Sequence, residues 1–375
     1  MSLFEEGGVV VSEDPRRRLP RGTVAGVWAL VVALLALLGM SFLPSPYVIE
    51  QPGPVYNTLG EVTDAEGESI PLISVDGAQT YPTDGSLDLL TVQVVGSPER
   101  RLSWLDVALA WFDPTKAVVP IETIYPTGQT SEQRSQQNAT LMIDSQQDAT
   151  AAALQFLGHD VDPQLEISGI LDGSAAGGVL ETGDIVLAAD DTPVTRLEDL
   201  REIINAGEGA PISFRIDRDG TERTVEVTPT AGTGEAAGTW QVGISLLTVY
   251  DFPFDVSIEL NNVGGPSAGM MFALGMIDTL TPGELNGGAQ VAGTGTIVAD
   301  GTVGAIGGIR QKLWGAADAG AEYFLAPSAN CDEVVGHVPD GLQVFSVATL
   351  DDAVAVLDAI ADEGDLASLP VCAAG

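Results

Sequence analysis

Residues 256–280 read VSIELNNVGGPSAGMMFALGMIDTL, and this stretch places one serine between two regular elements. The alternating apolar residues of 256–260 predict a strand, and the apolar run 270–280 predicts a buried helix. Ser267 therefore lies in a glycine-rich loop at a helix N-terminus. Free backbone N–H groups and the positive end of the helix dipole meet there, so the loop is suited to hold an oxyanion beside a hydroxyl nucleophile.

The residues around this serine have the composition of a substrate-binding loop. Gly265, Pro266 and Ala268 flank Ser267, and glycine lets a substrate carbonyl approach the backbone closely. We expect these three residues to shape the oxyanion site. The bare pattern G-x-S-x-G arises by chance in a chain with 44 glycines, and a serine nucleophile also needs a base.

Lys312 is the base that the sequence offers. Lysine is nearly absent from the chain, in which only Lys116 and Lys312 occur. Lys312 follows two glycines and opens an alanine-rich helical stretch, whereas a lone lysine at a helix start is usually a solvated surface charge. Apolar neighbours disfavour the ammonium form and lower the pKa of a lysine, so a neutral amine can take the serine proton.

These motifs together resemble the proteolytic domain of Lon-type serine proteases. The resemblance rests on GPSAG at 265–269, on TGTIVADGTVGAIGGIRQK at 294–312 and on the helix and strand that follow. It implies that Ser267 is the nucleophile and Lys312 the general base of a Ser-Lys dyad. It also implies that Thr294 hydrogen-bonds the lysine.

Two positions depart from the family pattern. Many members have an acidic residue directly before the Gly-Pro-Ser, where this chain has Gly264, and Gly-Glu after the threonine, where it has Gly295 and Thr296. We expect these departures to affect the tuning of the dyad and not its identity. Residues 87–95 and a helix predicted over 131–157 resemble the first half of the same domain.

A separable unit lies between these two halves. Residues 165–229 predict two strands, an amphipathic helix that begins with a capping box of Thr195 and Glu198, and a hairpin that turns at Asp219 and Gly220. The unit therefore reads as a small mixed module that is inserted into the larger domain.

The module resembles a bacterial PDZ domain. The resemblance rests on the pattern G-S-A-A-x-G-x-L-x-x-G-D-I over 173–185, followed by the helix and the hairpin. It implies a sheet edge that binds the C-terminus or an extended segment of another chain by β-augmentation. The carboxylate-binding loop would lie near residues 159–166. A packing module without a ligand is the alternative.

The N-terminus carries a candidate membrane span. Residues 24–43 form an uncharged apolar run, whose length of roughly 30 Å matches one hydrocarbon core. A signal peptide would have a shorter apolar region and a small-x-small cleavage site. Arg16, Arg17, Arg18 and Arg21 precede the run, and the next basic residue is Arg100. The positive-inside rule therefore predicts a single-pass cell-membrane protein with a cytoplasmic N-terminus and an extracytoplasmic catalytic domain.

The charge balance excludes several classes of partner. The formal net charge is −38, which argues against nucleic-acid binding and leads us to expect that the domain stands off anionic headgroups. Two cysteines and two histidines leave no material for a Cys-rich or His-based metal site. Neither lysine stands in a Walker A motif, so we expect no ATP hydrolysis and no cofactor.

The two cysteines, Cys331 and Cys372, are predicted to form a disulfide. The predicted topology places both in an oxidising exterior, where such bonds persist. The bond would tie the acidic C-terminus to the domain. Two free thiols in a cytoplasmic protein would be the alternative.

The predicted fold is an α/β (α+β) Lon-type proteolytic domain with an inserted PDZ-like module and one N-terminal transmembrane helix. The predicted domains are, in chain order, a cytoplasmic tail (1–22), a transmembrane helix (23–45), a connector with the first part of the proteolytic domain (46–158), a PDZ domain (159–232), the catalytic part (233–365) and a C-terminal tail (366–375). The start of the connector, residues 46–62, is predicted to be extended because it is rich in proline and glycine.

We therefore expect a membrane-anchored serine endopeptidase that acts without ATP on proteins recruited or gated by the PDZ domain. Two alternatives stay open. One is a Ser-His-Asp hydrolase in which His337 is the base, although Ser267 does not follow its strand directly as in a nucleophile elbow. The other is a PDZ adaptor with an inactive protease domain, against which the joint presence of Ser267, Thr294 and Lys312 speaks.

Overall fold

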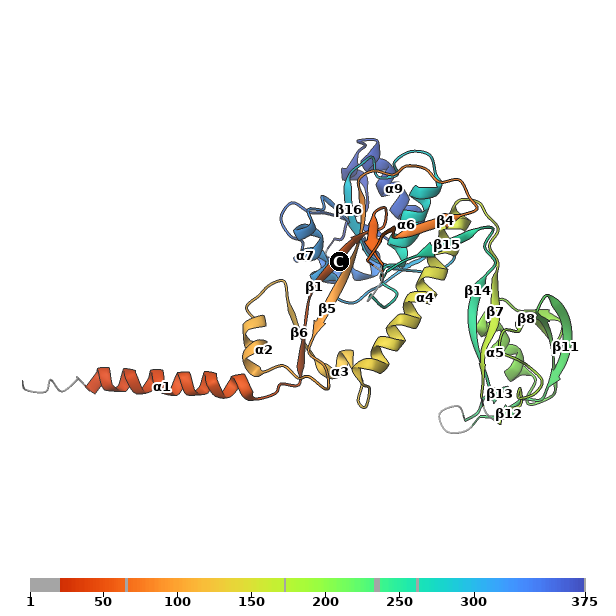
Figure 1. Cartoon of the computed structure of the whole chain (residues 1–375), viewed down its shortest axis with the longest axis horizontal. Helices are drawn as coiled ribbons and strands as arrows, with labels where there is room; N and C mark the ends of the chain where they lie inside the picture. Colours follow the sequence, from red (N-terminus) through yellow and green to blue (C-terminus); the bar gives the residue numbers. More distant parts are fainter. Residues whose placement is uncertain (1–20, 65–66, 172, 233–236, 261–262, 374–375) are drawn as a thin grey trace, which may run out of the picture.

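The computed structural model describes residues 21–64, 67–171, 173–232, 237–260 and 263–373. The predicted cytoplasmic tail lies outside these ranges except for residues 21 and 22. Figure 1 shows a long helix at one end, a central α/β body and a small β-rich module at the other end.

The long helix is α1 (Arg21–Phe42), and it projects from the body without covering partners. Residues 22–42 are apolar enough to cross a membrane, with a mean hydropathy of 2.4 and no burial inside the protein. Its end at Phe42 agrees with the predicted span to within three residues. Length and composition are thus those of a membrane span.

The central body is built on a six-stranded sheet. Its strands lie in the order β20 (Gln343–Val347), β19 (Tyr323–Pro327), β16 (Gln290–Gly293), β5 (Ser86–Val95), β1 (Tyr47–Asn57) and β6 (Ala117–Pro120). The first four run parallel to one another, and β1 runs antiparallel to both β5 and β6.

Residues 46–62 are largely extended, as predicted, but the prediction of a connector is wrong, because most of this segment is the sheet strand β1. Pro52 pairs with Val92, and the ladder then shifts register between Pro52 and Val55. Since proline cannot donate to a ladder, it is tolerated in a strand at such an irregularity. The bulge therefore lets a proline-rich segment join the sheet.

Helices cover both faces of this sheet. Successive residues of β5 point to opposite sides, so Leu87 and Leu89 pack in the core of α6 (Gly269–Leu280), whereas Leu90 packs in the core of α7 (Ile309–Ala319). The α6 core also includes α4 (Ser131–Phe156) and α9 (Leu350–Ala361). α6 is buried along almost its whole length, in agreement with its apolar sequence.

Short elements complete the body. Residues 69–76 are divided between two antiparallel pairs. The short elements are β2 (Glu61–Thr63) with β3 (Ser69–Pro71), β4 (Ile73–Asp76) with β15 (Asp255–Ile258), β17 (Thr296–Ile297) with β18 (Val303–Gly304), and the helices α2 (Trp104–Ala110), α3 (Ile121–Ile124) and α8 (Cys331–Val334), with single 3-10 turns at Ser328–Asn330 and Leu366–Ser368.

The β-rich module has its own sheet and its own apolar core. The strand order is β11 (Thr221–Val227), β10 (Ile212–Arg218), β8 (Ile185–Ala189), β7 (Pro163–Ile170) and β14 (Ile244–Tyr250), with β9 (Thr192–Pro193) beside β8, α5 (Leu197–Ala206) and the pair β12 (Thr230–Ala231) and β13 (Trp240–Gln241). Because β14 pairs with β7, the module extends beyond the boundary predicted at residue 232.

Two local predictions for the module have opposite outcomes. The hairpin turn at Asp219 and Gly220 is confirmed, and both residues have positive φ angles, 53° and 74°. The prediction of a capping box formed by Thr195 and Glu198 is wrong. α5 begins one residue later than that motif requires, so Arg196 occupies the N-cap and no side chain caps the helix.

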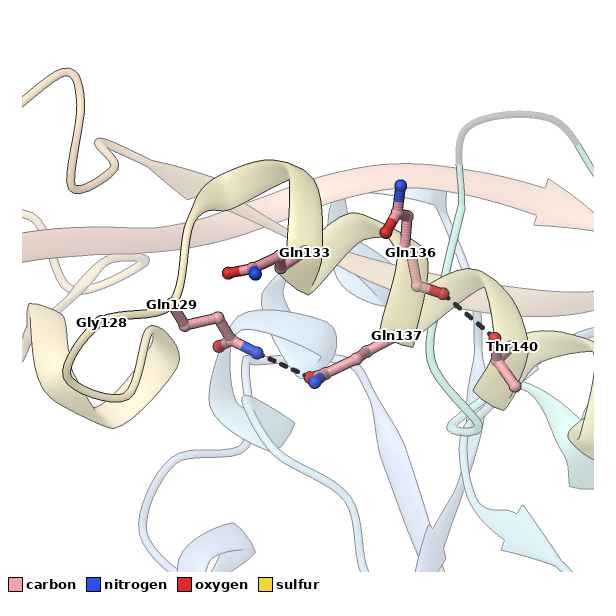
Figure 2. Close-up of a pocket in the computed structure, with 6 residues that line it drawn as sticks. All are labelled: Gly128, Gln129, Gln133, Gln136, Gln137 and Thr140. Carbon is pink, nitrogen blue, oxygen red and sulfur yellow. Dashed lines mark hydrogen bonds between the residues drawn. The ribbon is translucent and has the colours of Figure 1, made fainter. Parts of the chain in front are cut away.

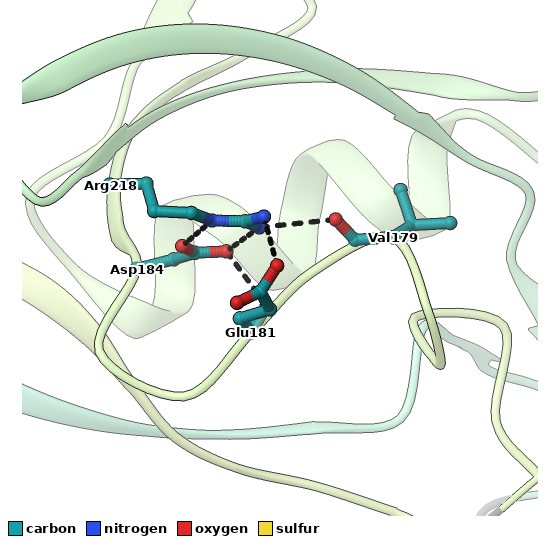
Figure 3. Close-up of polar contacts among 4 residues, drawn as sticks. All are labelled: Val179, Glu181, Asp184 and Arg218. Atoms are coloured by element: carbon teal, nitrogen blue, oxygen red, sulfur yellow. Dashed lines mark hydrogen bonds and ion pairs between the residues drawn. The ribbon is translucent and has the colours of Figure 1, made fainter.

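An ion pair closes one side of the module (Figure 3). Arg218 on β10 donates from Nε and Nη2 to the two oxygens of Asp184, at 2.6 and 2.7 Å, and also contacts Glu181 and the carbonyl of Val179. Asp184 is 1% exposed. Burial alone would raise the pKa of this carboxyl, but the hydrogen bonds from Arg218 and from the Glu181 backbone lower it overall. The pair thus pins residues 179–184 against the hairpin.

Candidate active site

Ser267 lies in the loop between β15 and α6, where α4 holds the loop in place. Gly265 has a φ of +92°, which only glycine adopts readily, and its N–H donates to the carbonyl of Asn138 at 2.8 Å. Ser145 donates from Oγ to the carbonyl of Pro266 at 3.0 Å. Two polar residues of α4 therefore fix the backbone on the N-terminal side of the serine.

Lys312 approaches this serine from the first turns of α7. Its Nζ lies 2.8 Å from Ser267 Oγ and 2.8 Å from Thr294 Oγ1. Thr294 also donates from Oγ1 to the carbonyl of Ser267, at 2.9 Å. The structure thus brings together three residues that lie 18 to 45 positions apart in the chain.

The lysine is enclosed by the protein. Its residue is 2% exposed, and burial lowers the pKa of Lys312 to about 7. The two hydroxyl groups are its hydrogen-bond partners among the described residues, and they carry no charge that would favour the ammonium form. A substantial neutral fraction at neutral pH follows, which is the form that accepts a proton.

The three predicted loop residues do not contribute equally to an oxyanion site. The N–H of Gly265 is used by Asn138, and Pro266 has no N–H. The N–H groups of Ser267 and Ala268 have no hydrogen-bond acceptor within the part of the chain that the structure describes. Ala268 is the N-cap of α6, so its N–H group lies at the positive end of the helix dipole.

The absence of an acidic side chain at Gly264 has a steric reason. A Cβ at this position would lie 2.8 Å from Cβ and 3.1 Å from the carbonyl carbon of Asn138. α4 therefore packs so closely against the loop that only glycine fits without a shift. The space that an acidic side chain would need is occupied by the helix backbone.

Sequence reasoning missed Asn138 and Ser145. Both lie more than 120 residues before the nucleophile loop, and Ser145 is 121 positions from Pro266. One serine and one asparagine in a glutamine-rich helix have no pattern that distinguishes them. His337 is not part of the site's contacts, since it is exposed and its Nδ1 lies 3.1 Å from the carbonyl of Val335.

A pocket of about 590 Å³ opens beside the serine loop, between α4 and the end of β15. Val263 and Gly264 of the serine loop line one part of it, and Ile258 at the end of β15 lines another, together with Glu259 and Leu260, which follow the strand. β15 pairs on its other side with β4. The pocket therefore exposes a strand end next to Ser267.

Figure 2 shows a second pocket, of about 470 Å³, at the N-terminal half of α4. Its side chains are Gln129, Gln133, Gln136, Gln137 and Thr140, and Gln129 donates from Nε2 to Gln137 Oε1 at 2.7 Å. These groups do not titrate in the physiological range. The pocket thus offers hydrogen bonds but no acid, base or activated nucleophile.

A third pocket, of about 620 Å³, lies in the β-rich module between α5 and β14. Its lining is mainly apolar and includes Leu197, Leu200, Ile204 and Leu246. β14 is the last strand of its sheet. Residues 159–166 do not line this groove, whose strand side is formed by residues 239–246.

Two further predictions concern cysteines and metals. Cys331 and Cys372 form a disulfide, with Cα atoms 4.9 Å apart. Within the described ranges there is no group of three or more His, Cys, Asp or Glu side chains that could hold a metal ion.

Family models match two segments of the chain. The model of the Lon protease C-terminal proteolytic domain matches residues 261–359, and the model of the PDZ domain matches residues 164–228. The first match includes Ser267, Thr294 and Lys312. The second match ends before β14.

Curated relatives align with the catalytic region. The Lon protease of Lachnoclostridium phytofermentans is 36% identical over 91 residues, which are 24% of this chain and 11% of that protein. The Lon protease of Geobacter metallireducens is 32% identical over 113 residues, which are 29% of this chain and 14% of that protein. The alignments thus span a small part of these relatives' length.

Solved structures of PDZ domains align with about a fifth of this chain. The PDZ domain of an SdrC-like protein from Listeria monocytogenes is 19% identical and covers 22% of this chain and 86% of that chain, with a TM-score of 0.21. The corresponding domain from Listeria innocua is 17% identical and covers 22% and 92%, also with a TM-score of 0.21.

Proposed function

We propose, from the premise that this chain contains a Lon C-terminal proteolytic domain and a PDZ domain, that the protein is an ATP-independent serine endopeptidase with a Ser267–Lys312 dyad. One observation carries the proposal. The Nζ atom of a fully buried lysine lies 2.8 Å from the hydroxyl oxygen of a serine at a helix N-terminus. This is the geometry that a nucleophile and its base need.

The reaction follows from these positions. The neutral amine of Lys312 accepts the Ser267 proton while Oγ attacks the carbonyl carbon of a peptide bond. The N–H groups of Ser267 and Ala268 stabilise the oxyanion that forms. The ammonium group of Lys312 then protonates the leaving amine, which leaves an acyl-enzyme, and water hydrolyses the ester with Lys312 again as the base. Thr294 orients the lysine by its hydrogen bond.

The substrate chain would bind in an extended form along the end of β15. This strand end faces the pocket that leads to Gly264, and β-augmentation would place a substrate carbonyl near Ser267. The pocket carries one cationic and one anionic side chain, Arg134 and Glu259. We expect these two charges to influence which substrate side chains the pocket accepts.

The PDZ domain would recruit or gate protein substrates. The groove between α5 and β14 combines an apolar lining with a strand at the edge of its sheet, and this combination suits an extended segment or a C-terminus. The predicted insertion fits the chain path, since α4 leads into β7 and β14 leads into β15.

The location that we propose is the cell membrane, with α1 as a single-pass anchor, residues 1–20 on the cytoplasmic side and the catalytic domain outside. The length and hydropathy of α1 support the anchor, and the arginines before it support the orientation. An exterior without ATP is consistent with hydrolysis that needs none.

A serine-reactive fluorophosphonate tests the assignment on the full chain. Wild type should be labelled and should cleave a short fluorogenic peptide, whereas Ser267→Ala and Lys312→Ala should do neither. His337→Ala is the matched control and should behave as wild type. Loss of labelling in His337→Ala would support a Ser-His-Asp hydrolase instead. A wild-type chain without labelling or cleavage would support an inactive PDZ adaptor.

A further inference from the structure

An exposed apolar cluster lies at the end of α2, outside every site described above. Phe112 is 89% exposed, Trp111 is 75% exposed and Leu109 is 65% exposed. Among the described residues beyond α1, every other Phe, Tyr or Trp side chain is at most 38% exposed. Large apolar side chains that gather at one exposed place usually mark an interaction surface.

This cluster is tied to the outer end of α1. The N–H of Trp104 donates to the carbonyl of Leu43 at 3.1 Å, and the N–H of Ser45 donates to the carbonyl of Leu102 at 2.7 Å. The ring of Trp104 also packs edge-on against Tyr47, with centroids 5.8 Å apart. In Figure 1, α2 accordingly lies beside the end of α1 from which the body begins. The cluster therefore stays at the level where the candidate span ends.

α2 presents two different faces. Val107 and Ala110 are buried against the body, whereas Leu109 points its side chain into solvent. Ser103 and Asp106 form a capping box that fixes the start of the helix, so the orientation of these faces is set locally. The exposed apolar side of this short helix is therefore suited to a second apolar environment.

The charge of this region differs from that of the rest of the chain. Residues 100–116 contain three basic residues and two acidic residues, although the whole chain has a net charge of −38. Arg100 and Arg101 are exposed. Anionic headgroups therefore do not repel this surface as they repel the rest of the acidic domain. Tryptophan is typical of membrane interfaces. Three of the five tryptophans of the chain, Trp28, Trp104 and Trp111, lie in or beside the candidate span.

We propose that residues 104–112 form an interfacial docking element, which inserts Leu109, Trp111 and Phe112 into the headgroup boundary of the bilayer that α1 spans. This proposal rests on the membrane anchor proposed above. The occupant of the cluster is lipid, because the cluster is continuous with the span and lies at its end. With two points of attachment, α1 and α2, the catalytic body is held at a fixed height and tilt over the membrane.

The test uses the full chain with Trp28→Phe, reconstituted in phosphatidylcholine vesicles whose acyl chains are brominated near the headgroup. Bromine quenches tryptophan fluorescence only at short range. We expect quenching of this protein, and we expect Trp111→Phe to remove a large part of the quenched intensity. Trp240→Phe is the matched control, because Trp240 lies in the PDZ groove, and it should leave the quenched intensity unchanged. An unchanged Tm of both variants would show that they are folded.

Alkaline carbonate extraction of the same vesicles separates the two proposals. A chain that stays in the vesicles while Trp111→Phe leaves the quenching unchanged would overturn the docking element alone. A chain that carbonate releases would overturn the anchor and the docking element with it. A third outcome combines two observations: the detergent-solubilised chain self-associates, the double variant Trp111→Ser with Phe112→Ser does not, and bromine quenches neither. This outcome would assign the cluster to a second copy of the chain and would also overturn the proposal.

Discussion

Pro163 and Tyr250 stand opposite each other in the ladder between β7 and β14, so the chain enters and leaves the PDZ module at one place. The exit is also tied to the catalytic body, because Tyr250 donates from Oη to Asp148 Oδ1 on α4 at 2.8 Å. A module that joins its host at one place can be removed without breaking the host's sheet.

Replacement of residues 164–249 by a short Gly-Ser linker should therefore leave a folded peptidase. The excised chain should cleave short peptides at near the wild-type rate, because Ser267, Lys312 and the residues that hold them lie outside the deletion. It should lose selected protein substrates. Rates on a peptide and on a folded protein substrate give the measurement. If the excised chain keeps its fold but loses peptide cleavage, the module supports the active site and recruitment is the wrong account.

Lys312→Arg should lower kcat/KM for peptide cleavage by about 1000-fold or more, which is the scale of losing a general base together with the geometry of the nucleophile. A guanidinium group keeps the positive charge and cannot lose its proton in a protein. Wild-type kcat/KM should rise as the pH passes about 7, where the amine becomes neutral. An active Lys312→Arg enzyme would contradict the assigned base.

Lys312→Met should raise the free energy of unfolding at pH 7, and this gain should shrink as the pH rises. Burial lowers the pKa of Lys312 from 10.5 to about 7, so between these values the unfolded chain binds a proton that the folded chain does not. The free energy of unfolding of the wild type therefore rises with pH between about 7 and 10.5, by at most about 1.4 kcal/mol per pH unit. Below about pH 7 the lysine is charged in both states, so the folded protein bears the full cost of burying that charge. Urea unfolding from pH 6 to 10 gives the measurement.

Lys116→Met is the matched control for that series. Lys116 is the other lysine of the chain, and its side chain is 34% exposed beside Asp113 at 3.3 Å. Its effect should stay small over the same range, as is usual for an exposed ion pair. A Lys312→Met gain that does not vary with pH would show that the lysine is not neutral in the folded protein.

Arg218→Met should destabilise the PDZ module, because it leaves the carboxylate of Asp184 buried without its partner. Arg215→Met on the same strand is the control. Its pair with Glu222 is exposed and 3.7 Å long, so the expected loss is below about 1 kcal/mol. The lowered pKa of Asp184 means that the pair stabilises the module at neutral pH and that this contribution is lost as the pH falls through the folded-state pKa. Equal losses in both variants would contradict the assignment.

A count of free thiols in denaturant should give about zero without reductant, because Cys331 and Cys372 are bonded. Cys372→Ser should lower the free energy of unfolding by about 3–4 kcal/mol in the chain-entropy model, since the bond closes a separation of 41 residues. Reductant should lower the Tm of wild type and leave that of the double serine variant unchanged. Two free thiols in the purified chain would speak against the bond and against an oxidising exterior.

Local patterns predicted the elements that obey local rules. The helix predicted over residues 131–157 agrees with α4 to within one residue, and the hairpin at Asp219 and Gly220 forms as expected. Both depend on interactions within a few residues: a cap for the helix, and left-handed backbone angles for the turn. The capping box at Thr195 failed although its pattern was present, because the first turn of α5 starts at Leu197 and places Arg196 at the cap.

By itself, the sequence predicted the residues of the proposed dyad and the order of the domains. A serine in a glycine-rich loop before an apolar helix, and one lysine in a chain almost without lysine, are properties of residue type and spacing. Tertiary structure alone decided the rest. It placed β1 in the central sheet and β14 in the PDZ sheet, because strand pairing depends on long-range hydrogen bonds that no local pattern records. It also brought Asn138 and Ser145 to the serine loop and enclosed Lys312, since close packing between segments more than 100 residues apart sets both the loop backbone and the pKa of the lysine.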